Sequence, residues 1–357
     1  MKMPTLLLAS LCSTAPALCA QQAAAPVVSL KTTTINLAQP PFAGPYWLQG
    51  KPACDAAGNV YTRPSDGATT RDPKRIARLP VQEVNPAGAT VRNFRGADAF
   101  PDGWGMGAAV GPDSAVYQIV GANRQADIYV VEYAPDGSVK AKTRLETGLR
   151  RQPGLPDLAL FKSGEYLVTG TTGKDGHFRT PYTAVFAADG RLVKEIYEPE
   201  DEEARQKAEL GDLDYAPDRV GNHFVSMGDA TTGSDGNVYV LRRTPRGSLT
   251  LIYVISPVGD VVRKLRIDAG DNDLVARSIR SYAGRLAVGF GSRTEAGPYR
   301  IKVVDLQGSS VADYSVAYPE AFVGDEGLDL ACYDSAGLTL VPDSTEFKSY
   351  MLRAKLP

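Results

Sequence analysis

The sequence predicts an all-β fold, a six-bladed β-propeller, because two turn motifs recur along the chain at a nearly fixed step. The first motif ends in a glycine, at Gly88, Gly137, Gly190, Gly259 and Gly308. The steps between these glycines are 49, 53, 69 and 49 residues. Short apolar strands between turns rich in Gly, Asp and Pro, repeated with such a period, are typical of four-stranded propeller blades.

The second motif is a short turn followed directly by an apolar strand. Glycine allows the positive φ of a tight turn, and β-branched and aromatic residues suit a pleated, half-buried strand. Six occurrences predict six blades. They are Gly58-Asn59-Val60-Tyr61, Ser114-Ala115-Val116-Tyr117, Gly164-Glu165-Tyr166-Leu167, Gly236-Asn237-Val238-Tyr239, Gly284-Arg285-Leu286-Ala287 and Gly337-Leu338-Thr339-Leu340.

Residues 1–20 have the features of a signal peptide. Lys2 gives a basic start, residues 6–11 are apolar, and Leu18-Cys19-Ala20 offers small residues for cleavage. We therefore expect one mature domain over 21–357 that is soluble and secreted or periplasmic. Cys19 leaves a lipoprotein alternative open. No later segment approaches the roughly twenty apolar residues of a membrane span, so we expect no membrane insertion.

The charge balance argues against a highly charged partner. Without Lys2 the chain has 38 basic and 41 acidic residues, a net charge of −3. The basic residues are scattered through the predicted outer strands and form no stripe. We expect no nucleic-acid partner, and the partner is predicted to be an unknown protein or small molecule.

Blade four shows the order of strands within one repeat. An inner strand over 224–229 leads into a second strand at 238–242 and a third at 249–256. The last strand, 260–267, places Val261, Arg263, Leu265 and Ile267 on one face, which predicts an outer strand with its other face in water. Blades two, three and five follow the same order.

The two ends of the chain are predicted to complete blade six. Residues 348–357 match the third strand of a blade, and residues 27–37 form a lone strand-like segment before the first full blade. We expect the N-terminal strand to be the outer strand of blade six, which closes the ring without an exposed strand edge.

With this unit, the chain resembles the six-bladed propellers of the NHL and TolB-like groups over essentially its whole mature length. The segment that carries the resemblance most clearly is Ser234-Asp235-Gly236-Asn237-Val238-Tyr239-Val240. Its residues are structural, so the resemblance implies a fold and is almost silent on activity.

The irregular step of 69 residues predicts an insertion at about 199–223, between blades three and four. Residues 200–210 have the pattern of a short helix, with Pro199 at its start, acidic residues in the first turn and Gly211 after its end. The helix is interpreted as a solvated surface helix or, alternatively, as a lid or docking element.

We expect a ligand or partner site on one rim of the ring. Propeller topology gathers there the loops that enter the inner strands and the loops that join second strands to third strands. The alternative is that these loops are polar for solvation and that the tryptophans plug the ring. The candidate residues are Trp47, Asp102, Trp104, Arg150, Arg151, His177, His223, Asp271, Asp273 and Arg293.

Catalytic chemistry has little support in the sequence. His177 and His223 are the two histidines, which are too few for a zinc site built on histidine. Calcium needs only oxygen ligands, which residues 271–273, Asp157, Asn222, Asp325 and Asp329 could supply. There is no nucleophile-elbow motif and no phosphate-binding glycine loop.

We therefore expect a non-catalytic binding or interaction module without a cofactor, with calcium as the open alternative. Six-bladed lactonases use a divalent ion in the channel, so the alternative function that the fold implies is a metal-dependent hydrolase of the lactonase type. No lactonase motif matches this chain residue by residue, and whether the protein is an enzyme is left open by the sequence.

Cys54 and Cys332 lie at the ends of the predicted inner strands of blades one and six, which are neighbours in a closed ring. A disulfide between them would connect the first blade to the last. Cys54 directly precedes its turn aspartate, whereas Cys332 lies two residues before Asp334, so strand alternation would point the two side chains to opposite faces. Two buried free thiols are the alternative.

Overall fold

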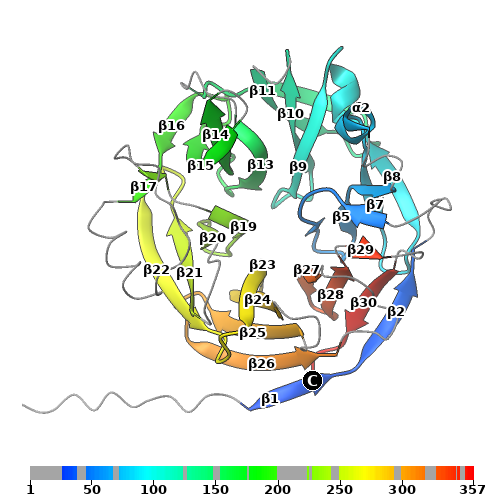
Figure 1. The fold of residues 1–357 in the computed structure, drawn as a ribbon, viewed down its shortest axis with the longest axis vertical. Helices are drawn as coiled ribbons and strands as arrows, with labels where there is room; N and C mark the ends of the chain where they lie inside the picture. The colour runs from blue at the N-terminus through cyan, green and yellow to red at the C-terminus, as the bar shows by residue number, and fades with distance from the viewer. Residues whose placement is uncertain are drawn as a thin grey trace, which may run out of the picture.

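Six sheets, five with four strands and one with five, surround a central axis in the computed structural model, which confirms the predicted propeller (Figure 1). The predicted signal peptide, the predicted helix at 200–210, and the candidate residues Arg150, Arg151 and Arg293 lie outside the described residues. The structure describes residues 26–37, 46–66, 72–123, 127–147, 153–174, 177–198, 223–224, 227–242, 249–292, 299–317, 327–342, 344–345 and 350–357.

In blades one to three the strands follow one another from the axis outward in chain order. Blade one contains β4 (Ala53–Cys54), β5 (Val60–Thr62), β7 (Val81–Val84) and β8 (Thr90–Phe94). Blade two contains β9 (Trp104–Val110), β10 (Val116–Ala122), β11 (Asp127–Tyr133) and β12 (Val139–Arg144). Blade three contains β13 (Pro153–Leu160), β14 (Tyr166–Lys174), β15 (His177–Phe186) and β16 (Leu192–Glu195).

Blades four to six keep this order, except that an N-terminal strand completes blade six. Blade four contains β19 (Met227–Thr232), β20 (Val238–Arg242), β21 (Leu249–Ile255) and β22 (Val261–Asp268). Blade five contains β23 (Leu274–Tyr282), β24 (Arg285–Ser292), β25 (Tyr299–Asp305) and β26 (Ser310–Val316). Blade six contains β27 (Leu328–Asp334), β28 (Gly337–Pro342), β30 (Tyr350–Ala354) and β2 (Thr32–Asn36).

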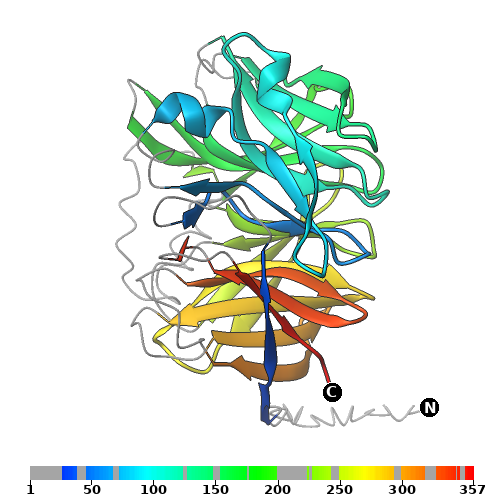
Figure 2. The same ribbon diagram turned by 90° about the vertical axis from the view of Figure 1, so that its right-hand side faces the viewer.

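The N-terminal segment closes the ring as predicted, but it forms two strands rather than one. β2 pairs antiparallel with β30 and is the outer strand of blade six. β1 (Val27–Leu30) pairs in parallel with β26 and adds a fifth strand to blade five. The segment therefore crosses from blade five to blade six along the outside of the ring (Figure 2).

In two of the blades an aspartate holds the turn of the second sequence motif. In blade four, Asp235 accepts hydrogen bonds from the backbone N–H of Asn237 at 3.2 Å and from the hydroxyl of Tyr239 at 2.8 Å. Asp55 makes the same two contacts in blade one, at 3.0 Å from both Asn59 and Tyr61. Gly236 and Gly58 adopt positive φ, which favours glycine at this position.

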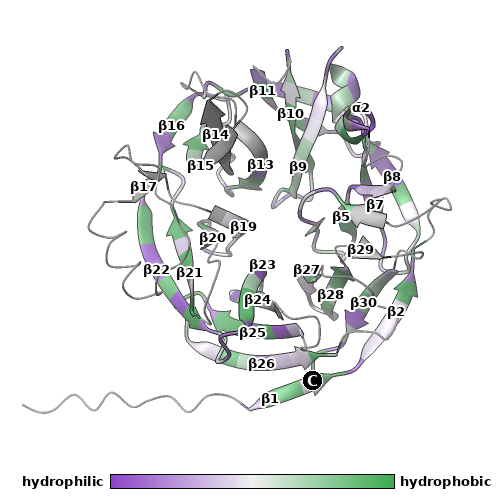
Figure 3. Cartoon of the chain, in the orientation of Figure 1, coloured by the Kyte–Doolittle hydropathy of each residue, from purple (hydrophilic) through white to green (hydrophobic). Residues whose placement is uncertain are grey.

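The core is divided among the six interfaces between neighbouring blades. Inner, second and third strands supply most of the buried side chains. The outer strand β22 alternates between hydrophobic residues, green in Figure 3, and hydrophilic residues, purple, as its sequence predicts. Four buried residues make up the cluster between blades six and one in the described part of the chain: Val60, Ala331, Val341 and Met351.

A disulfide between Cys54 and Cys332 reinforces the interface between blades one and six, with Cα atoms 5.4 Å apart. The two thiols are therefore not free, and the argument from strand alternation was wrong. β27 contains a bulge between Leu330 and Cys332, where one extra residue interrupts the register with β28. This bulge lies before Cys332, and the register from Cys332 to Asp334 is regular. The two cysteines do point to opposite faces of their sheets, but neighbouring blades of a ring meet through opposite faces, so the two side chains face each other.

Several short elements were not predicted. α2 (Pro73–Ala77) begins with Asp72, which accepts a hydrogen bond from the N–H of Lys74 at 3.0 Å, and Pro73 occupies its first turn. The others are the 3-10 helix η1 (Gly96–Ala99), the sheet formed by β3 (Tyr46–Leu48), β6 (Pro64–Asp66) and β29 (Ser344–Thr345), and the pair β17 (Tyr197–Glu198) and β18 (His223–Phe224).

In the part of the chain that the structure describes, no helix has the length and hydrophobicity needed to cross a membrane.

Candidate functional site

A cavity of about 440 Å³ lies on the axis of the ring. All six blades contribute to its wall: blades one to five through the inner strand and the turn after it, and blade six through Tyr333 of its inner strand. The lining residues are 51–56, 108–112, 114, 157–160, 162, 229–234, 280–284 and 333.

The wall of this cavity consists largely of the free edges of the inner strands. Each inner strand lies at one end of its sheet, so one row of its backbone N–H and C=O groups has no strand partner and faces the axis. Side chains of a strand point to the two faces of its sheet, here toward the neighbouring blades. Ala53, Ala108, Ala109, Ala159 and Ala230 line the cavity, and their methyl groups are too small to cover the backbone.

A bulge in the inner strand recurs in blades two to six, where this strand has one more residue than its partner. Asp229 lies within the bulge of β19, between Met227 and Ala230. Bulges redirect side chains and are frequent beside functional sites. Of the residues inside these bulges, Asp229 carries a charge and lines the cavity.

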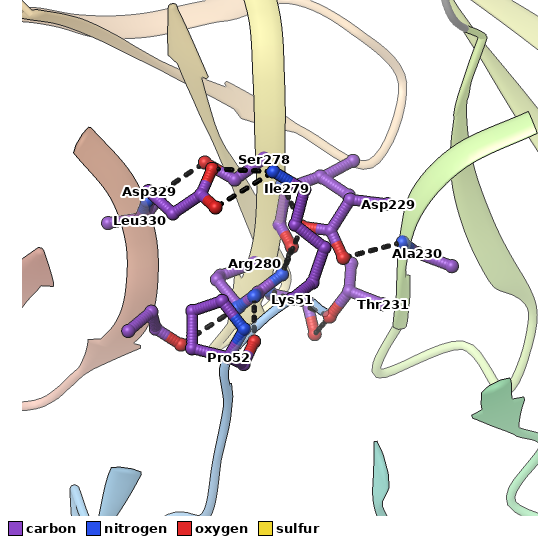
Figure 4. Close-up of polar contacts among 12 residues, drawn as sticks. Lys51, Pro52, Asp229, Ala230, Thr231, Ser278, Ile279, Arg280, Asp329 and Leu330 are labelled. Atoms are coloured by element: carbon purple, nitrogen blue, oxygen red, sulfur yellow. Dashed lines mark hydrogen bonds and ion pairs between the residues drawn. The ribbon is translucent and has the colours of Figure 1, made fainter. Parts of the chain in front are cut away.

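Arg280 and Asp229 form a buried ion pair in the wall, with both side chains 8% exposed (Figure 4). The carboxylate of Asp229 also accepts hydrogen bonds from the N–H groups of Ala230 and Ile279, each at 3.0 Å. The guanidinium of Arg280 donates to the carbonyl oxygen of Ala331 at 2.8 Å and to that of Pro52. Both charges are therefore matched within the protein.

Lys51 and Asp329 form a second ion pair beside the first. The ammonium of Lys51 lies 2.8 Å from both carboxylate oxygens of Asp329. Asp329 is 1% exposed, whereas Lys51 is 26% exposed and lines the cavity. The side chain of Lys51 therefore presents a positive group to the cavity, and Asp329 behind it supplies the opposite charge.

The turns at one end of the cavity form its mouth. Lys162 donates a hydrogen bond to the carbonyl oxygen of Ser234 at 2.6 Å, which connects the turns of blades three and four. Tyr282 and Tyr333 also line the cavity, with ring centroids 5.7 Å apart and an angle of 69° between the planes. Burial raises the pKa of the Tyr333 hydroxyl, so this group stays protonated at neutral pH.

Among the predicted site residues whose side chains the structure describes, Asp102, Trp104, Asp271 and Asp273, none lines this cavity. Trp104 begins β9 and packs, partly buried, against the core between blades two and three. Asp102 is exposed and accepts a hydrogen bond from the N–H of Asn123 at 3.0 Å. Asp271 and Asp273 are exposed in the turn between β22 and β23, where Asp271 accepts the N–H of Asp273 at 2.9 Å.

The other predicted residues lie on separate elements. Trp47 is in β3, His177 begins β15 and His223 begins β18. Asp157 lines the cavity and Asp329 lies directly behind its wall; the sequence singled out both as possible calcium ligands. Within the described ranges, no group of three or more His, Cys, Asp or Glu side chains could hold a metal ion.

Sequence reasoning missed the ion pairs of Lys51 and Arg280. A signal for Asp229, the partner of Arg280, was present, because Asp157 and Asp229 each lie four residues before the residue that begins the next turn, Phe161 and Gly233. Lys51 has the same position before Asp55. Aligning the repeats from this turn therefore places charged residues at one level of the ring.

No protein-family model matches this sequence. No curated protein matches it either.

Solved structures share the fold over most of both chains. Virginiamycin B lyase from Staphylococcus aureus is 12% identical, with a TM-score of 0.51, and the match covers 92% of this chain and 100% of the lyase. A protein of unknown function from Dyadobacter fermentans is 10% identical, with a TM-score of 0.52 and coverage of 92% and 99%. A luciferin-regenerating enzyme is 8% identical, with a TM-score of 0.54 and coverage of 91% and 97%. At these identities the similarity shows the fold alone.

Proposed function

We propose that this protein is an exported, non-catalytic binding propeller that holds a small molecule in its central channel. The observation that carries this proposal is the axial cavity of about 440 Å³, to which all six blades contribute. Its size falls within the range of roughly 300–1,000 Å³ that is usual for small-molecule sites. This location differs from the rim that the sequence favoured.

The packing around the cavity supports a preformed site. Its wall is built from inner strands, and each blade interface next to it contains a buried hydrophobic cluster. The ion pairs Asp229–Arg280 and Lys51–Asp329 fix the side chains on one side of the channel. A ligand that enters such a site pays little conformational entropy for ordering the protein.

A mutation at the mouth tests the proposal. Ala56 and Ala57 are neighbouring exposed residues of one turn, but only Ala56 lines the cavity. Replacement of Ala56 by Trp should obstruct entry, whereas Ala57→Trp is a matched control of equal bulk. Ligands found by a thermal-shift screen should bind Ala56→Trp at least about tenfold more weakly, a difference of roughly 1.4 kcal/mol. Equal affinity for both variants would exclude the channel as the site.

The alternative, a divalent-metal hydrolase of the lactonase type, is tested with the metal. Melting of the protein with excess calcium and with EDTA, together with metal analysis of the untreated sample, measures whether an ion stabilises the folded state. We expect no shift in Tm. The reason is that no group of three or more His, Cys, Asp or Glu side chains among the described residues could hold an ion. A shift of several degrees with near-stoichiometric metal would contradict this expectation and favour the hydrolase.

A further inference from the structure

We propose that the channel binds a small, uncharged, hydroxyl-rich molecule, of the class of cyclic polyols and simple saccharides. This inference rests on the proposed function and specifies its ligand. Three properties of the cavity lead to it: the charges in its wall, the backbone groups that face the axis, and the aromatic rings beside them.

The charged residues of the wall are held by other protein groups. The cavity is lined by Lys51, Lys162 and Arg280 and by Asp55, Asp157 and Asp229, with Asp329 directly behind the wall. Asp229 is paired with Arg280, and Lys51 with Asp329. A ligand with a net charge would lose its hydration on entry and would have to displace such contacts to reach a counter-charge. The wall therefore favours a ligand without net charge.

Asp55 and Lys162 are also held by protein groups. Asp55 accepts hydrogen bonds from the N–H of Ala57 and Asn59, the Asn59 side chain and the Tyr61 hydroxyl, all between 2.8 and 3.0 Å. Lys162 donates to Ser234 in the adjacent blade. To bind a charged ligand directly, either residue would have to give up contacts that hold a turn in place.

The hydrogen-bonding groups around the cavity require a ligand that can both donate and accept. The free edge of an inner strand alternates N–H donors and C=O acceptors along the channel. Thr231, Thr232 and Ser281 add hydroxyl oxygens that donate to protein groups, so they are left as acceptors for a ligand hydroxyl. A ligand hydroxyl is at once a donor and an acceptor, so a molecule with several hydroxyls can satisfy this mixed surface without carrying charge.

The tyrosines provide an apolar counterpart. Tyr282 and Tyr333 meet edge to face in the wall of the cavity. Their rings, with the alanine methyl groups nearby, offer carbon surface to the C–H groups of a ligand ring, while their hydroxyls keep a polar end. A cyclic molecule with a polar periphery and C–H faces uses both kinds of surface.

The experiment compares neutral probes with charged analogues of nearly the same shape. Isothermal titration calorimetry would be run on the protein with glucose, cellobiose, trehalose and myo-inositol, and with glucuronate and glucosamine as the anionic and cationic analogues of glucose. We expect at least one neutral probe to bind, and a charged analogue to bind about tenfold more weakly because its charge is desolvated without a partner. The Ala56→Trp and Ala57→Trp variants are titrated in parallel.

The possible outcomes separate the ligand class from the site. If no neutral probe binds, or if glucuronate or glucosamine binds as tightly as glucose, the proposed class is wrong. If a neutral probe binds Ala56→Trp as tightly as Ala57→Trp, the channel is not its site and the proposed function fails. Loss of binding in Ala56→Trp, retention in Ala57→Trp and the preference for neutral probes together would support both.

Discussion

Arg280 of blade five donates a hydrogen bond to the carbonyl oxygen of Pro52 in blade one, although blade six lies between these two blades in the ring. The same guanidinium pairs with Asp229 of blade four and donates to Ala331 of blade six. One side chain therefore connects four of the six blades at the axis. The channel and the closure of the ring depend on the same residue.

Replacement of Arg280 by Ala should strongly destabilise the fold. The change leaves the buried carboxylate of Asp229 without its counter-charge, and breaking a buried pair in this way typically costs about 3–5 kcal/mol. Urea unfolding of the wild type and the variant measures this loss. The double variant Arg280→Met with Asp229→Leu is the control, because it removes both charges and should be more stable than Arg280→Ala. A loss below about 1 kcal/mol for Arg280→Ala would contradict the assigned role.

The sequence predicted the number of blades because turn formation is local. Asp235, Gly236 and Tyr239 lie within one turn and the strand after it, so the hydrogen bonds and the positive φ that form this turn depend on residues close together in the sequence. The contact between Arg280 and Pro52 joins residues 228 positions apart. No periodic pattern within one repeat indicates which side chains meet across the axis, so the ion pairs of the channel could not be predicted from spacing.

The disulfide shows a second limit of sequence reasoning. Strand alternation correctly placed Cys54 and Cys332 on opposite faces of their sheets. Neighbouring blades of a ring meet through opposite faces, so this placement favours the bond, and the conclusion drawn against it was wrong. The direction of a single side chain is thus informative only together with the face through which its blade meets the next one.

Loss of the disulfide should weaken the closure of the ring. The bond joins residues 278 positions apart, and the hydrophobic cluster at this interface has four buried members in the described part of the chain. A native disulfide typically contributes about 2–4 kcal/mol, so Cys54→Ser with Cys332→Ser should lower the free energy of unfolding by that amount. Thermal and urea unfolding measure the change. A matching thiol assay on the unreduced, denatured chain from residue 21 onward should detect no reactive thiol, and two thiols would contradict the bond.

The stability of the protein should fall as pH rises above the ordinary pKa of glutamate, in part because of Glu83. Burial raises the pKa of Glu83 from 4.5, and the guanidinium of Arg92, 3.4 Å from its carboxylate, opposes this only in part. Between the unfolded pKa and the raised folded pKa, the folded state binds more protons than the unfolded state, so stability decreases with rising pH.

Glu83→Gln removes this contribution and provides the measurement. Relative to the wild type, the variant should gain stability as the pH increases from about 4 to 7, because the wild type must then bury a charged carboxylate. The difference in Tm between the two proteins would be recorded across this range. If the difference is constant, or changes in the opposite direction, the Arg92 ion pair outweighs burial and the assignment is wrong.

The two N-terminal strands should differ in their importance for the ring. Removal of residues 21–37 deletes both β1 and β2 and leaves β30 as an open sheet edge, whereas removal of residues 21–31 deletes β1 and keeps β2 on β30. An exposed edge strand is prone to pair with other chains. We expect the longer deletion to lower Tm and to aggregate, as measured by light scattering, and the shorter one to stay closer to the wild type. The shorter deletion alone keeps the antiparallel pairing of β2 with β30, which runs from Thr32–Ala354 to Asn36–Tyr350. Equal behaviour of the two deletions would therefore show that β2 is not what closes blade six.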